Sequence, residues 1–535
     1  MHVFDEQDEE DDFRGVDESS RTEIVSIGSV INHSLRNERF LMIFHYGGDE
    51  DIDLTESGIP VVYCEGKLLW TNHGRFQFPQ KELRVMSSSA NIRMYFEEGE
   101  YMWESQVRAL FYKEAAEVVG YTGMDEIDPS VVVDCFLYSL FLTEELGGKS
   151  SNVDYGWATH ACNYWICDGI LDGNRAWEVG NALYGVIPTL DYFSAEAKYL
   201  ASLLDRNIKP YQGWNSITSN KQAAQNISAV RVNASSYFLT FEGDGQPEEL
   251  PNDMFQLASN LRVLKLCKCS FDFSSPPFRC CQKLRFLWLD NCTSTGKEEG
   301  EGACFPDLLV LEIRNTNYVL LPHMIELMTN LRELNTKGVS WRTLRHHFWK
   351  KLQNLQKLRF TESSDVIPLD NCSAVDMMNL ELLDFSGNTH MESLPEISSA
   401  GSLKVLILDG CSSLKHVAFK RAPPLIESFS FDGYGPADNW THPIQLPRKE
   451  LRPKSRVDRI EEANVTKISL EGCARLHSIF LRALFNLKEL DLSGTDIKTI
   501  DLGAMDVPQL KKLFLLGCML LWDGRNPRLD VLYLY

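Results

Sequence analysis

The chain has 535 residues, which is too many for one hydrophobic core and suggests roughly three or four structural units. Its hydrophobic fraction of 44% and charged fraction of 24% are those of an ordinary soluble protein. The net charge of −22 argues against nucleic acid as a partner of the whole chain, because so acidic a surface repels phosphate backbones.

The start of the chain carries no targeting signal that we can identify. Residues 1–20 are rich in Asp and Glu, lack the basic and apolar parts of a signal peptide, and are expected to form an acidic disordered tail. No segment approaches the ~18 uninterrupted apolar residues that span a bilayer. We therefore expect a protein without a membrane span, in the cytosol or nucleus, whose 14 cysteines are thiols.

Two strands are predicted within residues 21–125. The segment 39–46 is an apolar run after a basic residue, which is typical of a buried parallel strand. The segment 66–75, which ends in Arg75, resembles the strand and loop that come next in a known family of nucleotide-binding modules.

Residues 126–205 are predicted to be helical. The segments Cys135–Phe141 and Asn163–Ile170 are rich in aromatic and aliphatic side chains, and the second contains Tyr164-Trp165-Ile166 followed by Gly169. Either these segments belong to one defined helical subdomain, or they are two amphipathic helices of an unrelated fold. His160 and Cys162 fall in the second helical region, where we expect them to be packed in the core.

Taken in order, these segments resemble the central and C-terminal parts of the nucleotide-binding (NB-ARC) module of plant intracellular immune receptors, the NLR family, in its grass type. The resemblance implies a degenerate NB-ARC remnant over 21–125, a winged-helix-like region over 126–205, and a connector and repeat cap over 206–256. It also implies that the P-loop and an N-terminal signalling domain of the family are missing from this chain.

The same resemblance implies a nucleotide site that has lost its chemistry. The family's two Walker B carboxylates correspond to His45 and Tyr46, and its sensor arginine to Arg75, displaced from the usual position. No Gly-x-x-x-x-Gly-Lys-Ser/Thr loop, which would surround the phosphates with backbone N–H groups, is present. We therefore expect no cofactor, although family resemblance alone would suggest ADP or ATP.

From residue 257 to 535 the sequence is repetitive. The template Leu-x-x-Leu-x-Leu-x-x-Cys/Asn/Thr fits strongly at Leu261, Leu284, Leu308, Leu380, Leu403, Val465, Leu487 and Leu510, and more weakly at Leu331, Leu355, Ile426 and Leu529. Between 261 and 426 the copies start 23 to 25 residues apart. This pattern predicts a leucine-rich-repeat solenoid, with one insertion at about 432–464.

The insertion contains a basic run over 448–456, which could be a local positive patch or simply a solvated loop. In each repeat, the Leu-x-Leu step predicts a short strand with its leucines pointing inward. The Cys, Asn or Thr would then turn the chain, either bonding to a neighbouring coil or filling a small niche. The predicted fold class is therefore α/β: a partial α/β nucleotide-binding remnant, a helical winged-helix region, and a solenoid of short parallel strands.

The residues between the inward leucines should line a concave surface. An exposed tryptophan beside mixed charges, followed by an acidic strip, is a plausible protein-binding face, and the alternative is a set of solvated strand exteriors. The residues predicted for this face are Trp288, Asp290, Glu312, Arg314, Arg359, Asp384, Asp409, Glu471 and Asp491.

The sequence contains no recognisable catalytic motif and no Cys-x-x-Cys zinc spacing, so we do not expect an enzyme. The leading hypothesis is a disease-resistance protein whose repeats bind a pathogen effector or a host protein. The alternatives are a repeat adaptor, an active NTPase, and a truncated, non-signalling gene product. A solenoid that ended on the strand 532–535 without a polar cap would be poorly soluble.

Overall fold

The chain was analysed in a computed structural model. It describes residues 41–46, 67–72, 104–144, 152–186, 213–219, 229–241, 245–296, 303–316, 322–339, 352–363, 377–395, 400–447, 449, 462–518 and 531–534, apart from residues 125 and 439. The chain divides into two compact units, Met1–Tyr101 and Met102–Tyr535, and each is described by itself.

In the first unit the structure describes two strands, β1 (Leu41–Tyr46) and β2 (Lys67–Asn72). They pair in parallel, with Leu41 opposite Lys67 and Tyr46 opposite Asn72. Both predicted strands are therefore confirmed. The acidic tail and Arg75 lie outside the described residues. The assignment of this unit to a degenerate nucleotide-binding module remains a prediction.

The second unit begins with four helices, α4 (Glu104–Thr122), α5 (Pro129–Glu144), α6 (Asn152–Asp168) and α7 (Ala176–Val186). Asp128 precedes α5 and its carboxylate accepts a hydrogen bond from the Ser130 amide, as an N-cap does, while Pro129 takes the first helical position. Gly123 and Gly169 follow the ends of α4 and α6 with positive φ. The region 126–205 thus contains the helices α5, α6 and α7, α4 lies before it, and the winged-helix assignment remains a prediction.

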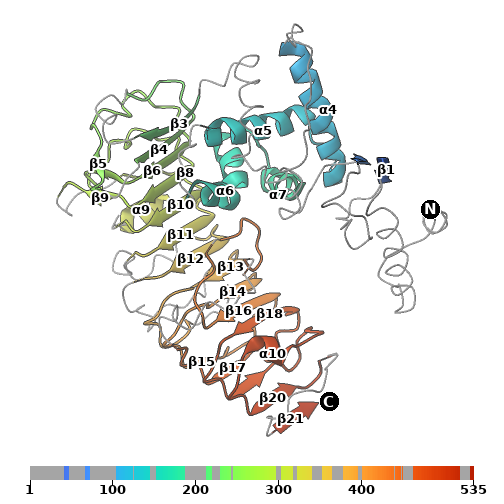
Figure 1. The fold of residues 1–535 in the computed structure, drawn as a ribbon. Coiled ribbons are helices and arrows are strands. Elements are labelled where there is room, and N and C mark those ends of the chain that lie inside the picture. The colour runs from blue at the N-terminus through green and yellow to red at the C-terminus, as the bar shows by residue number, and fades with distance from the viewer. Residues whose placement is uncertain are drawn as a thin grey trace. The chain divides into compact units, whose positions relative to one another are not determined.

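The helices are followed by a solenoid whose main sheet has 11 parallel strands (Figure 1). In chain order these strands are β3 (Trp214–Ser219), β4 (Ser236–Phe241), β6 (Val263–Cys267), β8 (Phe286–Asp290), β10 (Val310–Arg314), β11 (Glu333–Lys337), β12 (Lys357–Thr361), β13 (Leu382–Asp384), β14 (Val405–Ile407), β16 (Ser428–Asp432) and β18 (Ser478–Arg482).

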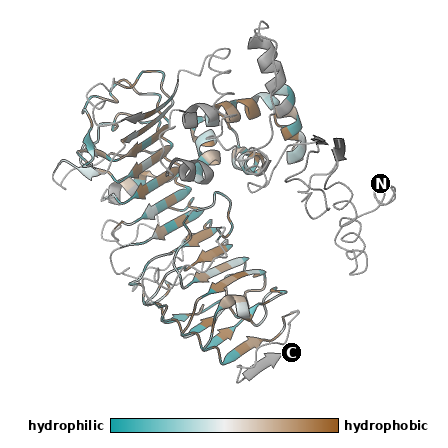
Figure 2. Cartoon of the chain, viewed as in Figure 1, coloured by the Kyte–Doolittle hydropathy of each residue, from teal (hydrophilic) through white to brown (hydrophobic). Residues whose placement is uncertain are grey.

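Strand register stacks equivalent residues of successive repeats. Leu264 pairs with Leu287, and Leu287 with Leu311, so the inward leucines form one column. All three are buried in a core that continues through the whole solenoid. Figure 2 shows the resulting alternation of apolar and polar residues along the strands. Each repeat buries its leucines only against the neighbouring repeats, so it is stable only as part of the stack.

The chain leaves most strands of the repeats through a residue with left-handed backbone conformation. Gly338, Gly387 and Gly410 occupy this position with φ near +70°, and Asn291 and Asn315 adopt it as well. The turn residue therefore precedes the Cys, Asn or Thr to which the sequence pattern assigned the turn. Those side chains instead fill the niche: the Asn388 amide and the Cys411 thiol donate to carbonyls of the preceding repeat.

The solenoid starts earlier than predicted. β3 pairs with β4 and β4 pairs with β6, so the stretch assigned to a connector and cap supplies two strands of the main sheet. Met254 and Phe255 are buried in the core of the repeats, whereas Leu257, the predicted entry point, is 58% exposed. The leucine template missed these strands because aromatic residues such as Tyr237 replace leucine there.

The last four predicted copies do not lie in the main sheet. Their strands join a second, parallel sheet formed by β15 (His416–Val417), β17 (Lys467–Ser469), β19 (Glu489–Asp491), β20 (Lys512–Leu515) and β21 (Val531–Leu534). The insertion shifts the phase of the repeat, so that β17 pairs with β15. The main sheet continues in β18, where Ile479 and Leu481, together with Leu476 just before the strand, form a copy that the sequence analysis overlooked.

Short elements complete the turns between the strands. A three-stranded sheet contains β5 (Glu248–Glu249), β7 (Cys269–Phe271) and β9 (Thr293–Ser294). Two short helices, α9 (Pro322–Leu327) and α10 (Leu502–Met505), occur in later repeats. None of the helices in the described part of the chain is long and apolar enough to cross a membrane.

Candidate functional site

The candidate site is the front face of the main sheet, the face opposite the leucine core. On β6, β8 and β10 the first outward side chain is apolar, namely Val263, Phe286 and Val310, and on β4 the second outward side chain, Phe238, is apolar. These four side chains are buried with residues of α4, α5, α6 and α7 in a second hydrophobic core. The helices therefore cover the early part of the front face, and α6 lies against it near β8 (Figure 1).

Asp168, at the end of α6, connects the helices to the first strands. Its carboxylate accepts hydrogen bonds from the Trp214 indole at 2.9 Å and the Ser236 hydroxyl at 2.8 Å. The Tyr138 hydroxyl of α5 lies 2.8 Å from the same Ser236 oxygen. The Tyr164–Gly169 segment is thus part of the buried contact between α6 and the solenoid.

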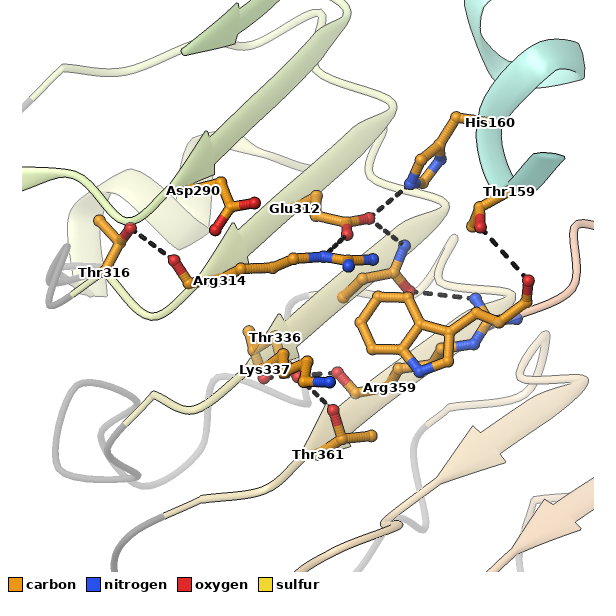
Figure 3. A network of polar contacts seen from close by, with 12 residues as sticks. Thr159, His160, Asp290, Glu312, Arg314, Thr316, Thr336, Lys337, Arg359 and Thr361 are labelled. Atoms are coloured by element: carbon orange, nitrogen blue, oxygen red, sulfur yellow. Dashed lines mark hydrogen bonds and ion pairs between the residues drawn. The ribbon is translucent and has the colours of Figure 1, made fainter. Parts of the chain in front are cut away.

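Glu312 on β10 is the centre of a buried polar network (Figure 3). Nε2 of His160, from α6, donates to its carboxylate over 2.5 Å, and Arg314 forms an ion pair with it. Burial alone would raise the pKa of Glu312, but Arg314 and His160 outweigh that effect and lower the pKa to about 2. Glu312 is therefore ionised at neutral pH inside the contact between helix and sheet.

Glu333 on β11 repeats this arrangement one strand further on. The Asn163 amide of α6 donates to its carboxylate over 2.9 Å and to Nδ1 of His160 over 3.0 Å. Lys357 forms an ion pair with Glu333. Burial raises the pKa of Glu333, yet Lys357 and other nearby cations lower it to about 2. One turn of α6 thus binds two adjacent carboxylates.

A second segment, residues 434–449, covers the next part of the front face, and we call it the strap. Trp440 is buried, with the Arg314 guanidinium 4.4 Å and the Arg359 guanidinium 5.4 Å from its ring centre. Arg359 also donates to the Thr441 carbonyl over 2.9 Å, and Lys357 to the His442 carbonyl over 2.7 Å. Cation–π contacts and charge-assisted hydrogen bonds hold this half of the strap.

The other half of the strap makes apolar and ionic contacts. Ile444 and Leu446 pack on Leu382, Val405 and Ile407, the outward side chains of β13 and β14.

The side chain of Lys449 is 5% exposed at the end of the strap, with its ammonium 2.7 Å from the Asp409 carboxylate and 3.9 Å from that of Asp432. Burial raises the pKa of Asp409, against the opposing effect of Lys449. Lys449 is the described member of the basic run 448–456, and it is an ion-pair residue here.

Helix α6 and the strap also contact each other. The Thr159 hydroxyl donates to the Trp440 carbonyl over 3.2 Å. His442 lies 2.9 Å from the Asn181 side-chain oxygen of α7, and its ring is 5.2 Å from that of Tyr184. Burial and the neighbouring Lys357 hold the pKa of His442 well below its usual value. The two covers of the front face therefore form one layer.

The structure brings together six of the nine predicted binding residues beneath this layer. Trp288, Glu312, Arg314, Arg359, Asp384 and Asp409 are all buried, so the expectation of an exposed tryptophan and an exposed mixed-charge face is wrong. Asp290 is partly exposed at the end of β8. Glu471 and Asp491 belong to coils of the second sheet and do not share the column in which they were predicted. The protein-binding role of all nine remains a prediction.

The sequence analysis expected His160 to be packed in the core, which is confirmed, but it missed Asn163, Trp440 and Lys449 as residues that cover the face. One signal was available. In the sequence of β6, β8 and β10 apolar residues occupy outward as well as inward positions, and such continuous apolar runs indicate strands covered on both sides. In β11 and β12 the same outward positions hold Glu333 and Lys357, which predicts a polar contact there.

No group of three or more His, Cys, Asp or Glu side chains in the described ranges is arranged to hold a metal ion. The front face instead carries alternating cations, carboxylates and aromatic rings along successive strands, and α6 and the strap of the same chain occupy them here. Such a surface is suited to recognising a polypeptide.

No family model matches the chain. Among characterised proteins, the disease resistance protein RRS1 of Arabidopsis thaliana is 26% identical over 164 residues, which are 27% of this chain. The match covers 12% of that protein, so the chain spans a small part of the length of the relatives it matches. A second RRS1 sequence of Arabidopsis thaliana matches at 26% over 173 residues.

Several solved structures are similar to part of this chain. A Leptospira interrogans leucine-rich-repeat protein, LIC12759, is 18% identical and covers 57% of this chain and 89% of its own, with a TM-score of 0.25. An internalin of Listeria monocytogenes, InlF, is 15% identical and covers 51% of this chain and 77% of its own, with a TM-score of 0.24. The parallel pairing of this chain's own strands makes it a leucine-rich-repeat solenoid, and it is distantly similar in sequence to a plant disease resistance protein.

Proposed function

We propose that this protein is a disease-resistance protein of the NLR type, in which the leucine-rich repeats recognise a pathogen effector or a host protein. The observation that carries the proposal is the front face of the main sheet, where a Trp, several Arg and Lys, and several Asp and Glu side chains are collected on successive strands. The sequence similarity to a disease resistance protein supports the defence role.

In this proposal the chain is not an enzyme, and it acts in the cytosol or nucleus by binding. β1, β2 and α4 belong to the remnant of the nucleotide-binding module, and α5 to α7 belong to its winged-helix region. The parallel pairing of β1 with β2 and the packing of α6 on the repeats support this assignment.

The defence role is tested by disrupting the encoding gene in its source organism and measuring pathogen growth. We expect greater growth of at least one pathogen and restoration of resistance when the gene is returned. Unchanged growth across bacterial, fungal and oomycete pathogens would contradict the proposal.

The proposed loss of nucleotide chemistry has its own test. After purification without added nucleotide and denaturation of the protein, chromatography of the supernatant should yield ADP or ATP far below one equivalent per chain. Stoichiometric ADP would show that the site is intact, without bearing on what the repeats recognise.

A further inference from the structure

The strap presents a regular series of side chains to the front face. Trp440 contacts Arg314 and Arg359, Ile444 and Leu446 contact the outward side chains of β13 and β14, and Lys449 contacts Asp409. The contacts progress from β10 to the coil after β14 as the strap progresses in sequence. The strap therefore lies on the sheet as a linear peptide lies on a binding surface.

The charges of the sheet that face the strap also have partners within the sheet. Arg314 pairs with Glu312, Arg359 donates to the Asn335 side chain over 3.2 Å, and Arg482 pairs with Asp432 at 2.6 Å.

The carboxylate of Asp409 accepts hydrogen bonds from the Ser430 hydroxyl at 2.6 Å and the Asp432 amide at 2.8 Å. Removing the strap would expose these groups to water without leaving a buried charge unpaired, so the sheet can exist uncovered.

The apolar contact of the strap is separate from the main core. Leu382, Val405, Ile407, Ile444 and Leu446 form a cluster of their own, distinct from the leucine core that runs through the repeats. Displacement of the strap would therefore leave the inward leucine columns in place.

The covered interface is also imperfectly matched. Nδ1 of His442, on the strap, is buried without a hydrogen-bond partner among the described residues. An unsatisfied buried polar atom destabilises the covered state, and release of the strap would let water satisfy this one.

We propose that the front face from β10 to β18 is a binding site for an extended polypeptide, and that the strap occupies this site within the same chain. The partner would present an aromatic side chain to the Arg314–Arg359 pair, aliphatic side chains to β13 and β14, and a basic side chain to Asp409 and Asp432. The spacing of Trp440, Ile444, Leu446 and Lys449 defines the pattern. This inference rests on the proposed recognition function and specifies the chemistry of the partner.

The test uses a fluorescein-labelled synthetic peptide with the sequence of residues 434–449. Its affinity is measured by fluorescence anisotropy for the full wild-type chain and for a full chain with Trp440→Ala, Leu446→Ser and Lys449→Ser, in which the internal strap is weakened. We expect at least tenfold tighter binding to the variant, because the tethered strap competes at high effective concentration in the wild type.

Altered peptides identify the contacts that carry the binding. Peptides with Trp440→Ala or Lys449→Glu should bind the variant at least tenfold more weakly. A peptide with Gln445→Ala should bind normally, because Gln445 is exposed on the strap. Equal binding of all four peptides, or no gain in the variant, would overturn the proposal, and so would loss of a cooperative thermal transition in the variant.

Hydrogen exchange of the unaltered chain gives a second measurement. Amides of the strap should open at a lower free energy than amides of β12, because the strap moves while the sheet remains folded. Equal protection of the two would show that the strap is a fixed part of the core. If the peptide binds as expected but disruption of the gene leaves pathogen growth unchanged, this inference stands and only the proposed function is rejected.

Discussion

At the scale of single residues, the front face is governed by buried ionised groups. Glu312 and Glu333 are completely or almost completely buried, yet nearby cations hold the pKa of each carboxyl at about 2. Such pairs contribute little net stability over apolar residues, but breaking one partner leaves the other charge buried and uncompensated. Their arrangement therefore makes the fit between helix and sheet specific.

Substitution of Glu312 tests this view. Glu312→Gln should destabilise the chain by about 3 kcal/mol, because Arg314 then lies buried beside a neutral group. Thermal unfolding followed by circular dichroism measures the effect. The matched control is Glu392→Gln, which breaks an exposed ion pair with Lys415 and should leave the melting temperature unchanged. Equal effects of the two substitutions would show that the buried pair has no special role.

His442 should make stability depend on pH. Its pKa is lowered in the folded chain by burial and by Lys357, while Glu333 opposes and His160 and Arg359 add to the lowering. The unfolded chain therefore binds the proton first. The contribution of neutral His442 to the free energy of unfolding is fully present above about pH 6.5. It is lost as the pH decreases below that value.

The measurement is the melting temperature between pH 7.5 and pH 5.5. We expect it to fall in the wild type and to fall less in His442→Gln, which can still donate to Asn181. Identical pH profiles would mean that His442 is not protonated on unfolding in this range.

At the scale of elements, the helices are held by close packing as well as by polar contacts. A Cβ atom added to Gly180 of α7 would lie 2.4 Å from the Cys162 sulfur of α6 and 3.3 Å from a methyl carbon of Leu171. The absence of a side chain at Gly180 therefore lets α7 approach α6, which carries the contacts to the sheet.

Two glycine substitutions separate packing from helix propensity. Gly180→Ala should lower the melting temperature, because the gain of up to about 1 kcal/mol in propensity is outweighed by the clash. Gly120→Ala on α4 should raise it, because nothing lies within 4 Å of the added carbon. A stabilising Gly180→Ala would mean that α6 and α7 are not packed as described.

The repeats also share a recurring asparagine just before the first leucine of the template. The side-chain amides of Asn330, Asn354 and Asn379 each donate to a backbone carbonyl of the preceding repeat, over 2.9 to 3.1 Å. The sequence shows these asparagines at the repeat spacing, but only the structure shows where their hydrogen bonds go.

At the scale of the whole molecule, each early strand of the main sheet separates two cores. Leu287 on β8 points into the leucine core, and its neighbour Phe286 points into the core shared with the helices. Residues adjacent in sequence thus stabilise different layers, because successive side chains of a strand point to opposite faces.

This separation predicts different results for substitutions at neighbouring positions. Phe286→Ser should increase hydrogen exchange in α6 and α7 while the amides of β10 to β12 remain protected. Leu287→Ala should increase exchange in β6, β8 and β10, because it leaves a cavity in the repeat core, at a cost of about 2–5 kcal/mol. Uniform loss of protection in both variants would show that the two layers unfold as one unit.

The sequence by itself determined the repeat architecture. Leucine spacing identified the eight copies from Leu261 to Ile426 and the insertion after them, because a solenoid core imposes the same apolar pattern on every coil. It also indicated the strands β1 and β2 and the helical region before the repeats. It could not fix the start of the solenoid, because in β4 tyrosine and other apolar residues replace the template leucines.

Only the tertiary structure decided what happens to the front face. Trp288, Glu312 and Arg314 were correctly placed on one face from the sequence, but whether that face meets water or protein depends on segments more than 100 residues away, such as His160 and Trp440. The phase shift that moves Glu471 and Asp491 to coils of the second sheet also depends on how the insertion crosses the sheet. Periodicity records local strand geometry, whereas covering is a non-local contact that no repeat pattern encodes.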